Sequence, residues 1–274
     1  MNILFIGDIV GRPGRAMVAH HLLHLRKQKS VDVVVANAEN ASGGKGLTPA
    51  HFQDLLRAGV DVITLGDHVW DKKEIIPLLA QTDFLLRPAN YPPLAPGKGA
   101  VVLSFQRQPI AFLILQGRVF MNPPIDCPFQ TAERIIPELR KHTPIILVEI
   151  HCETTSEKMA IAWHLNGTVS AVVGTHTHIP TCDARILPGG TAYITDIGMT
   201  GPVDSVIGME PEDIIQRYRT GVFRHFRVAK SGNAVLNAVL ISVDPSSGKS
   251  LSIEHISLIS SPETLEHSSE ILEE

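Results

Sequence analysis

Metal-ligating side-chain types follow the C-terminal ends of five apolar, strand-like segments of this sequence. In chain order these residues are Asp8, Glu39, Asn40, Asp67, His68, His151, His176 and His178. In an open parallel sheet the carboxyl ends of the strands face one crevice, where ligands bind. We therefore expect residues that lie far apart in the sequence to meet at one site.

Each of these residues also has an ordinary structural interpretation. Asp8 could cap a loop, Asn40 could hold an Asx turn, and a single His151 is typical of a hydrogen-bonded histidine. His176 and His178 stand two residues apart, so in an extended segment both would project to the same side. Five strand ends that all carry ligand types rarely arise by chance, and together they favour a metal site.

The donor set indicates which metals such a site would hold. Carboxylates, an amide and imidazoles without cysteine suit iron, manganese or zinc, and they do not suit a structural thiolate zinc site. The candidate ligands exceed what one tetrahedral ion needs, so two adjacent ions are predicted, with Glu39 as the bridge. Two ions about 3.5–4 Å apart favour in-line displacement at phosphorus, because together they hold a hydroxide nucleophile and neutralise phosphoryl oxygens.

The loop ENASGGKGLT, residues 39–48, could approach a phosphate. Its glycines, Gly43, Gly44 and Gly46, would let the backbone lie close to a ligand, and Lys45 adds a positive charge. The spacing differs from that of a Walker A loop. A plain flexible connection explains the same residues equally well.

The segments that must position these residues alternate between strand and helix patterns, which indicates a largely parallel sheet. Strands are expected at 2–6, 31–36, near residue 62, at 144–150 and at 169–174. Helices are expected over 14–28, from Thr48 as N-cap with Pro49 at the first position, around 72–80 and around 156–165.

Antiparallel hairpins are expected between and after these segments. Residues 100–105 and 110–115 flank the polar turn QRQP, and residues 184–195 fold over Pro-Gly-Gly. Residues 221–259 would supply further antiparallel strands. A mixed sandwich of two packed sheets fits this order better than a pure Rossmann arrangement.

Composition and charge restrict the class of protein. The chain has 274 residues, of which 44% are hydrophobic and 19% charged, as in ordinary soluble domains. A net charge of −4 disfavours a protein that coats nucleic acid, so no stable DNA binding is expected. Neither a signal peptide nor a membrane span is expected. The cysteines, Cys127, Cys152 and Cys182, match no disulfide framework, which favours the cytoplasm.

Five stretches of the sequence resemble motifs of the YmdB-like branch of the calcineurin-like metallophosphoesterases. They read FIGDIVGRPGR, NAENASGGKGLT, GDHVWD, HCETTSEK and GTHTHIPTCDARILPGGTAYITDIGMTGP. The resemblance implies an α/β fold, a four-layer αββα sandwich with two mixed sheets flanked by helices. The resemblance covers residues 1–258, which are expected to form a single domain. Residues 259–274 are polar and acidic, and this composition predicts a flexible tail.

The resemblance also implies roles for individual residues. One ion would be held by Asp8, Glu39, Asn40 and His178. The other would be held by Glu39, Asp67, His151 and His176. His68 would lie beside the leaving-group oxygen as a general acid or as a donor to the phosphate. Thr155, Ser156, Glu157, Lys158 and Asp196 would lie on the substrate side or behind the ligands. The glycine-rich loop adds Gly43 and Lys45 as candidates on the substrate side.

Residue 67 departs from the family pattern, because the third motif of the family reads Gly-Asn-His and this sequence has Asp67 before His68. Asparagine offers its oxygen to a metal and keeps N–H donors for a phosphate oxygen, whereas an ionised aspartate cannot donate. We predict that the Asp67 form retains its metal and turns over phosphodiesters more slowly than an Asp67→Asn variant.

The sequence thus predicts a cytoplasmic dinuclear phosphodiesterase that uses iron or manganese, or else zinc. Its substrates would be small phosphodiesters such as 2′,3′- or 3′,5′-cyclic nucleotides. A metal-bridging hydroxide would attack phosphorus while His68 assists departure of the leaving oxygen. Two alternatives stay open: a phosphomonoesterase or nucleotidase, and a weakly active regulatory protein that binds metal and nucleotide. The resemblance is also compatible with a homo-oligomer.

Overall fold

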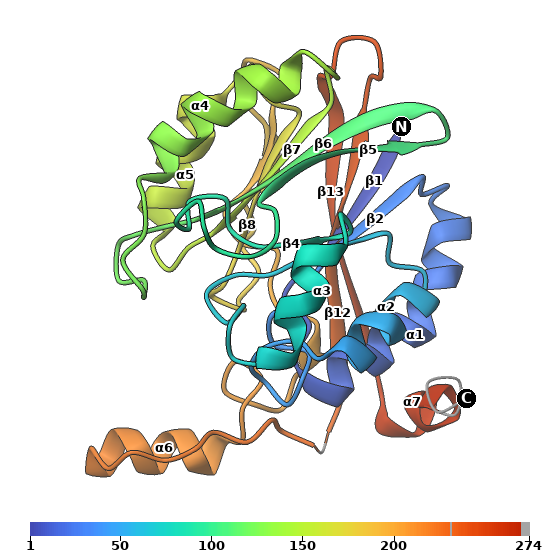
Figure 1. Ribbon diagram of the computed structural model, residues 1–274. Helices are drawn as coiled ribbons and strands as arrows, with labels where there is room; N and C mark the ends of the chain where they lie inside the picture. The colour runs from blue at the N-terminus through green and yellow to red at the C-terminus, as the bar shows by residue number, and fades with distance from the viewer. Residues whose placement is uncertain (231, 270–274) are drawn as a thin grey trace.

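The computed structural model describes residues 1–230 and 232–269. Its strands form two sheets that lie face to face, with helices on both outer sides (Figure 1). The strands are β1 (Asn2–Ile6), β2 (Val33–Asn37), β3 (Val62–Thr64), β4 (Leu85–Leu86), β5 (Ala100–Phe105), β6 (Gln108–Gln116), β7 (Ile146–His151), β8 (Ala171–Thr175), β9 (Arg185–Ile186), β10 (Ala192–Ile194), β11 (Gly201–Pro202), β12 (Ala234–Val243) and β13 (Ser250–Ser260). The helices are α1 (Gly11–Gln28), α2 (Pro49–Arg57), the 3-10 turn η1 (Lys73–Ile75), α3 (Ile76–Gln81), α4 (Pro128–Arg140), α5 (Thr155–Leu165), α6 (Pro211–Thr220) and α7 (Pro262–Ser269).

The first sheet has the order β11-β12-β1-β2-β3-β4, and β13 pairs with β12. Strands β1 to β4 are parallel, whereas β12 runs antiparallel to its neighbours β1, β11 and β13. Since β1, β2 and β3 point the same way, the residues that follow them emerge at one edge of the sheet.

The second sheet has the order β5-β6-β7-β8-β10-β9. Strands β6, β7, β8 and β10 are parallel, and the edge strands β5 and β9 are antiparallel to β6 and β10. The register places His151 at the end of β7 beside Thr175 at the end of β8. The antiparallel pairs β5–β6 and β9–β10 confirm both expected hairpins, over the QRQP turn and over Pro-Gly-Gly.

Apolar side chains fill three layers, which makes the molecule a four-layer sandwich. Side chains alternate between the two faces of each strand. In β1, Phe5 points between the sheets toward Phe112 and Leu147, whereas Leu4 points outward into the cluster that contains Met17 of α1. A third cluster joins β6, β7 and β8 to α4 and α5. The predicted αββα sandwich with two mixed sheets is confirmed.

The region of α6 and the residues that follow it differs from the sequence-based expectation. The pattern predicts antiparallel strands from residue 221, but the first of them begins at Ala234. Residues 221–228 instead run back along α6, a helix that the sequence pattern does not predict and that projects from the body of the molecule (Figure 1). An ion pair between Arg227 and Asp213, with Nε 2.8 Å from Oδ2, holds this return segment to the helix.

The C-terminal residues form more regular structure than a flexible tail would. Ile259 and Ser260 complete β13, and α7 follows, with Leu265 buried in the same cluster as residues of α1. Residues 270–274 of the expected tail lie outside the described residues. Within the described part of the chain, every helix is too short or too polar to cross a membrane.

Candidate metal centre

The strand ends bring four of the predicted ligands into one group. Glu39, Asp67, His151 and His176 each contribute one ligand atom, and these atoms lie within 4.8 Å of one another. They come from the ends of β2, β3, β7 and β8, so all four depend on the parallel order of the two sheets.

His151 lies at the middle of this group. Its Nε2 atom is 3.0 Å from Asp67 Oδ1, 3.2 Å from Glu39 Oε1 and 3.0 Å from Nδ1 of His176. Nδ1 of His176 is also 3.3 Å from Asp67 Oδ1. Donor atoms at such short mutual distances surround a space that a single cation could occupy.

The remaining predicted ligands, Asp8, Asn40 and His178, lie next to this group, and Asn40 contacts Glu39. The side-chain amide of Asn40 is 3.1 Å from Glu39 Oε1 and 3.1 Å from His178 Nε2. His178 Nε2 is 4.0 Å from Asp8 Oδ1. Glu39 Oε1 therefore contacts one side chain from each predicted set, Asn40 and His151, as a bridging ligand would.

Asp8 supplies a direct test of whether a cation fits. Its side chain is wholly buried, and Oδ1 has no hydrogen-bond partner within residues 1–230 and 232–269. Burial raises the pKa of Asp8. An unpartnered buried carboxylate oxygen is costly in free energy, and a metal ion beside it would remove that cost.

The charges in the first group also favour a cation. Burial alone would lower the pKa of His151, yet the carboxylates of Glu39 and Asp67 raise it well above its ordinary value. Burial would raise the pKa of Asp67 and of Glu39, but the hydrogen bonds and charge of His151 lower both. The carboxylates thus stabilise positive charge here, which an imidazolium supplies and a metal ion would also supply.

A buried chain of hydrogen bonds orients the His151 ring. The hydroxyl of Thr175 donates to Glu149 Oε1 at 2.7 Å, so its lone pair accepts from Nδ1 of His151 at 2.9 Å. Asn37 donates to the same Glu149 oxygen at 2.7 Å. A proton on Nδ1 leaves the lone pair of Nε2 directed at the ligand group, which is the role of an outer-shell partner at metal sites.

His178 is oriented by the backbone. Its Nδ1 atom donates to the carbonyl oxygen of Ile207 at 2.8 Å, which leaves Nε2 unprotonated and able to bind a metal. His176 differs, because its Nδ1 faces the ligand group and its Nε2 lies 3.1 Å from Glu153 Oε2.

The backbone at Gly66 passes close over the ligands. A Cβ atom at this position would lie 2.3 Å from Nε2 of His151 and 2.4 Å from Oε2 of Glu39. Only glycine therefore allows β3 to end here and turn into the Asp67–His68 segment. The backbone N–H of His68 then donates to Glu39 Oε2 at 3.1 Å.

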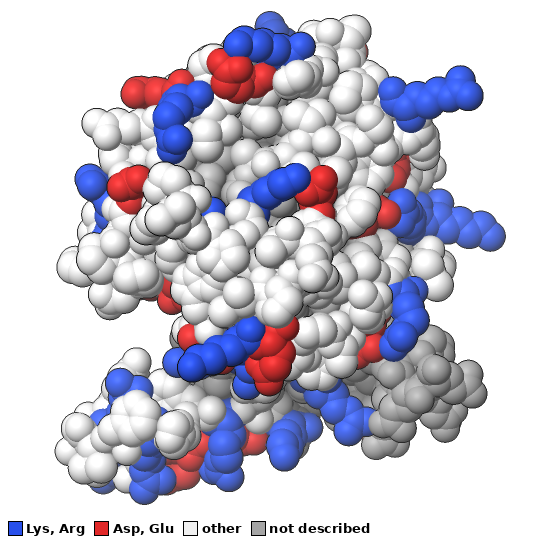
Figure 2. Space-filling view, viewed as in Figure 1, with Lys and Arg blue, Asp and Glu red and all other residues white. Residues whose placement is uncertain are grey.

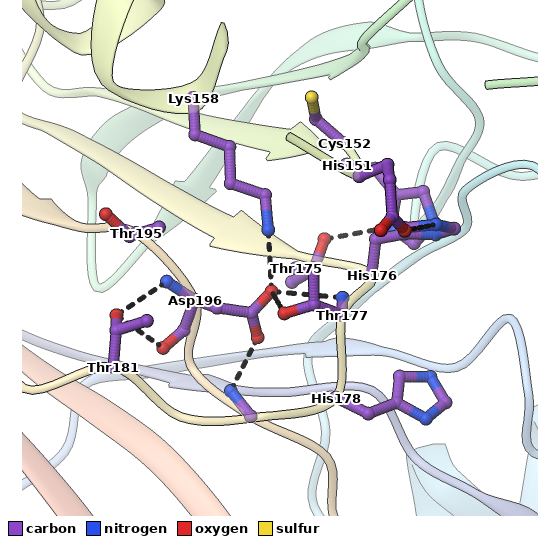
Figure 3. A network of polar contacts seen from close by, with 12 residues as sticks. His151, Cys152, Lys158, Thr175, His176, Thr177, His178, Thr181, Thr195 and Asp196 are labelled. Atoms are coloured by element: carbon purple, nitrogen blue, oxygen red, sulfur yellow. Dashed lines mark hydrogen bonds and ion pairs between the residues drawn. The ribbon is translucent and has the colours of Figure 1, made fainter. Parts of the chain in front are cut away.

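Asp196 holds the turn that carries His176 and His178, the two C-terminal predicted ligands (Figure 3). Its Oδ2 atom accepts hydrogen bonds from the backbone N–H of Thr177 at 3.1 Å and from the Thr177 hydroxyl at 2.7 Å. The same oxygen lies 2.6 Å from Nζ of Lys158, and both charged side chains are wholly buried. The flanking His176 and His178 adopt φ of 97° and 66°, a conformation that costs free energy and needs such support.

A cavity of about 340 Å³ opens beside the ligand group. His68 and Lys45 line it, together with Glu39, Asn40, His176 and His178. Nδ1 of His68 is 3.1 Å from Asp71 Oδ2, so Nε2 is the ring nitrogen that can act on a ligand in the cavity. His68 and Lys45 therefore lie where an anionic substrate would have to bind.

Other residues expected near the substrate lie elsewhere. Gly43 lines a different cavity, next to Arg12 and Arg15. Thr155 and Ser156 are exposed in the first turn of α5 and are absent from the residues that line the ligand-side cavity.

Three features of this site are not predicted from the sequence. Glu149 and Thr175 orient His151 from inside the sheet, and Glu153 contacts His176. Glu149 does carry a signal, because it is a carboxylate inside the apolar segment PIILVEI. The third feature is an apolar wall of the cavity formed by residues 206–226, which shows no clear pattern in the sequence.

The chain is similar to known proteins over nearly its whole length. It is 47% identical over 256 residues to a 2′,3′-cyclic-nucleotide 2′-phosphodiesterase of Bacillus subtilis (strain 168), a match that covers 93% of this chain and 96% of that protein. A novel phosphatase from Mycoplasma pneumoniae has a similar structure, with a TM-score of 0.90, 36% identity, and coverage of 99% of this chain and 98% of that one. A hypothetical protein from Thermus thermophilus gives a TM-score of 0.89 at 43% identity, covering 94% of this chain and 99% of that one. Residues 4–256 match the family model of YmdB-like proteins, and the chain therefore belongs to the YmdB-like family.

Proposed function

We propose that this protein is a metal-dependent phosphodiesterase that hydrolyses 2′,3′-cyclic nucleotides. The observation that carries the proposal is the group formed by Glu39, Asp67, His151 and His176 beside an open cavity. The similarity to a 2′,3′-cyclic-nucleotide 2′-phosphodiesterase supports the substrate class.

The donor set supports two ions, with iron or manganese as the metals. Asp8, Asn40 and His178 would hold one ion, Asp67, His151 and His176 would hold the other, and Glu39 would bridge them. This division is supported by the contacts of Glu39 Oε1 with Asn40 and His151. When bound, such ions supply a nucleophile at neutral pH and neutralise charge on phosphoryl oxygens.

The residues of the chain would then perform the remaining steps. Lys45 would hold the anionic substrate in the cavity that it lines. His68 would donate a proton from Nε2 to the leaving 2′ oxygen, while the Asp71 carboxylate at Nδ1 keeps the ring oriented. The buried ion pair of Lys158 with Asp196 would keep the histidine-bearing turn in place throughout.

A substrate panel tests this proposal. Metal-reconstituted protein should hydrolyse adenosine 2′,3′-cyclic phosphate to the 3′-monophosphate, and it should hydrolyse the phosphomonoester p-nitrophenyl phosphate far more slowly. The opposite preference would identify a phosphomonoesterase. Tight binding of the cyclic nucleotide without any turnover would identify a regulatory protein.

A further inference from the structure

The cavity beside the metal centre has two chemically different walls. One wall carries polar residues of the strand-end loops, among them Lys45 and His68. The other comes from a single segment of the chain, and we call it the apolar wall; it consists of Val206, Ile207, Met209, Ile214, Tyr218 and Phe226. A bare phosphate gains nothing from such a surface, so the cavity fits a phosphodiester that carries an apolar substituent.

The apolar wall is firmly attached at its base. Met209 and Ile214 are buried in one cluster with Val10 and Met199, and Phe226 packs against that cluster. The backbone N–H of Glu210 donates to the carbonyl of Arg227 at 2.8 Å, which joins the start of α6 to the segment that returns along it. A surface held in this way can position a ligand without first having to fold around it.

The apolar wall is also connected to the metal centre. The carbonyl oxygen of Ile207, a residue of the wall, accepts the hydrogen bond from Nδ1 of His178 at 2.8 Å. A group bound on the wall is therefore held at a defined distance from the place where the phosphate must react.

Tyr218 is the exposed aromatic residue of the apolar wall. Its side chain is 80% exposed although it lines the cavity. Phe226 is more buried, and the guanidinium of Arg217 lies 4.8 Å from its ring centroid. A flat heterocycle can stack on an exposed aromatic ring, whereas an aliphatic chain cannot make this contact.

The charge around α6 suits the same ligand. Basic side chains gather at this end of the molecule (Figure 2), where Arg217, Arg219 and Arg224 accompany the acidic Glu210, Glu212 and Asp213, and Asp213 is neutralised by Arg227. Their positive charge would attract a negatively charged nucleotide toward a site that contains three carboxylates.

We propose that the apolar wall is the nucleobase subsite of this enzyme and that Tyr218 stacks on the base. This inference rests on the proposed phosphodiesterase function. The phosphate would lie at the metal centre, the ribose between the two walls, and the base against Tyr218.

Two substrates that differ in the base test this inference. Adenosine 2′,3′-cyclic phosphate and glycerol 1,2-cyclic phosphate share the five-membered cyclic diester, and only the first has a base. In the Tyr218→Ala variant, the ratio of kcat/KM for the nucleotide to kcat/KM for the glycerol compound should fall about tenfold, mainly through KM. Tyr218→Phe should keep the ratio within about twofold of wild type, since it keeps the ring.

A matched control comes from the same helix. Ile215 is 45% exposed on α6 and does not line the cavity, so Ile215→Ala should leave the ratio unchanged. An unchanged ratio in Tyr218→Ala, or an equal fall for both substrates, would overturn the subsite. If the wild-type enzyme hydrolyses neither compound, the proposed function fails. In that case calorimetry compares the binding of adenosine 3′-monophosphate with that of glycerol phosphate. The subsite requires that Tyr218→Ala weakens binding of the nucleotide and leaves binding of glycerol phosphate unchanged.

Discussion

Nζ of Lys158 lies 2.6 Å from Oδ2 of Asp196, and both side chains are wholly buried beneath the turn that carries His176 and His178. Asp196 also accepts the backbone N–H of Gly198 at 2.8 Å through Oδ1. The ion pair therefore connects α5 to the segment that follows β10, and it does so directly behind two predicted metal ligands.

Replacing Lys158 should destabilise the fold. Lys158→Met leaves the Asp196 carboxylate buried without its counter-charge, and breaking such a pair costs about 3–5 kcal/mol in the free energy of unfolding. The double variant Lys158→Met/Asp196→Leu should recover most of that stability and still bind metal poorly, because the turn loses its acceptor. Urea unfolding and metal titration measure the two effects. Wild-type stability in Lys158→Met would contradict this account.

Removing the hydroxyl of Thr175 should weaken metal binding without unfolding the protein. Thr175→Val is close in shape but breaks the link from Glu149 to Nδ1 of His151, and loss of an outer-shell partner typically lowers metal affinity about 10–100-fold. Thr175→Ser keeps the hydroxyl and should retain the affinity. Competition with a chromogenic chelator measures it. Equal affinities in the valine and serine variants would show that the hydrogen-bond chain does not matter.

His68 should affect turnover rather than metal content. His68→Ala removes the proposed proton donor, for which the expected loss in kcat is about 10²–10⁴-fold. The matched variant Asp71→Asn removes only the charge that orients the ring and should lose less. Metal content by mass spectrometry should equal that of the wild type in both. A kcat within a few-fold of wild type in His68→Ala would exclude its role as general acid.

Asp67→Asn should raise turnover. The amide keeps a ligand oxygen and adds an N–H donor for a phosphate oxygen, and a hydrogen bond to a charged group contributes about 1.5–3 kcal/mol. If the transition state receives that bond, kcat/KM rises by about tenfold or more. The comparison uses adenosine 2′,3′-cyclic phosphate at equal metal loading. Equal or faster hydrolysis by the Asp67 form would refute the prediction.

The sheets and the ligand positions could be predicted because both follow from simple patterns. Buried strands are continuous apolar segments, and the ligand types stand at their carboxyl ends, so a parallel order brings Asp8, Glu39 and Asp67 together. The need for glycine at residue 66 does not follow from this pattern, because only the structure brings His151 against it.

The apolar wall could not be predicted in this way, and the resemblance places Lys158 and Asp196 near the site without indicating that they form a buried ion pair. Ile215 and Tyr218 are both exposed on α6 although only Tyr218 lines the cavity, so residue type does not show which face of that helix lines it. Lys158 and Asp196 are 38 positions apart in the sequence, and only the packing of α5 against the second sheet brings them together. Charged residues in helices and loops usually lie in solvent, so neither residue type indicates a buried partner.

Metal dependence of cyclic-nucleotide hydrolysis tests the central claim most directly. The protein should be stripped with a chelator, reloaded with manganese or iron, and assayed for metal content and for hydrolysis of adenosine 2′,3′-cyclic phosphate on the same preparation. We predict about two ions per chain in the reloaded protein, with activity lost on stripping and restored on reloading. Equal hydrolysis by stripped and reloaded protein would contradict the account.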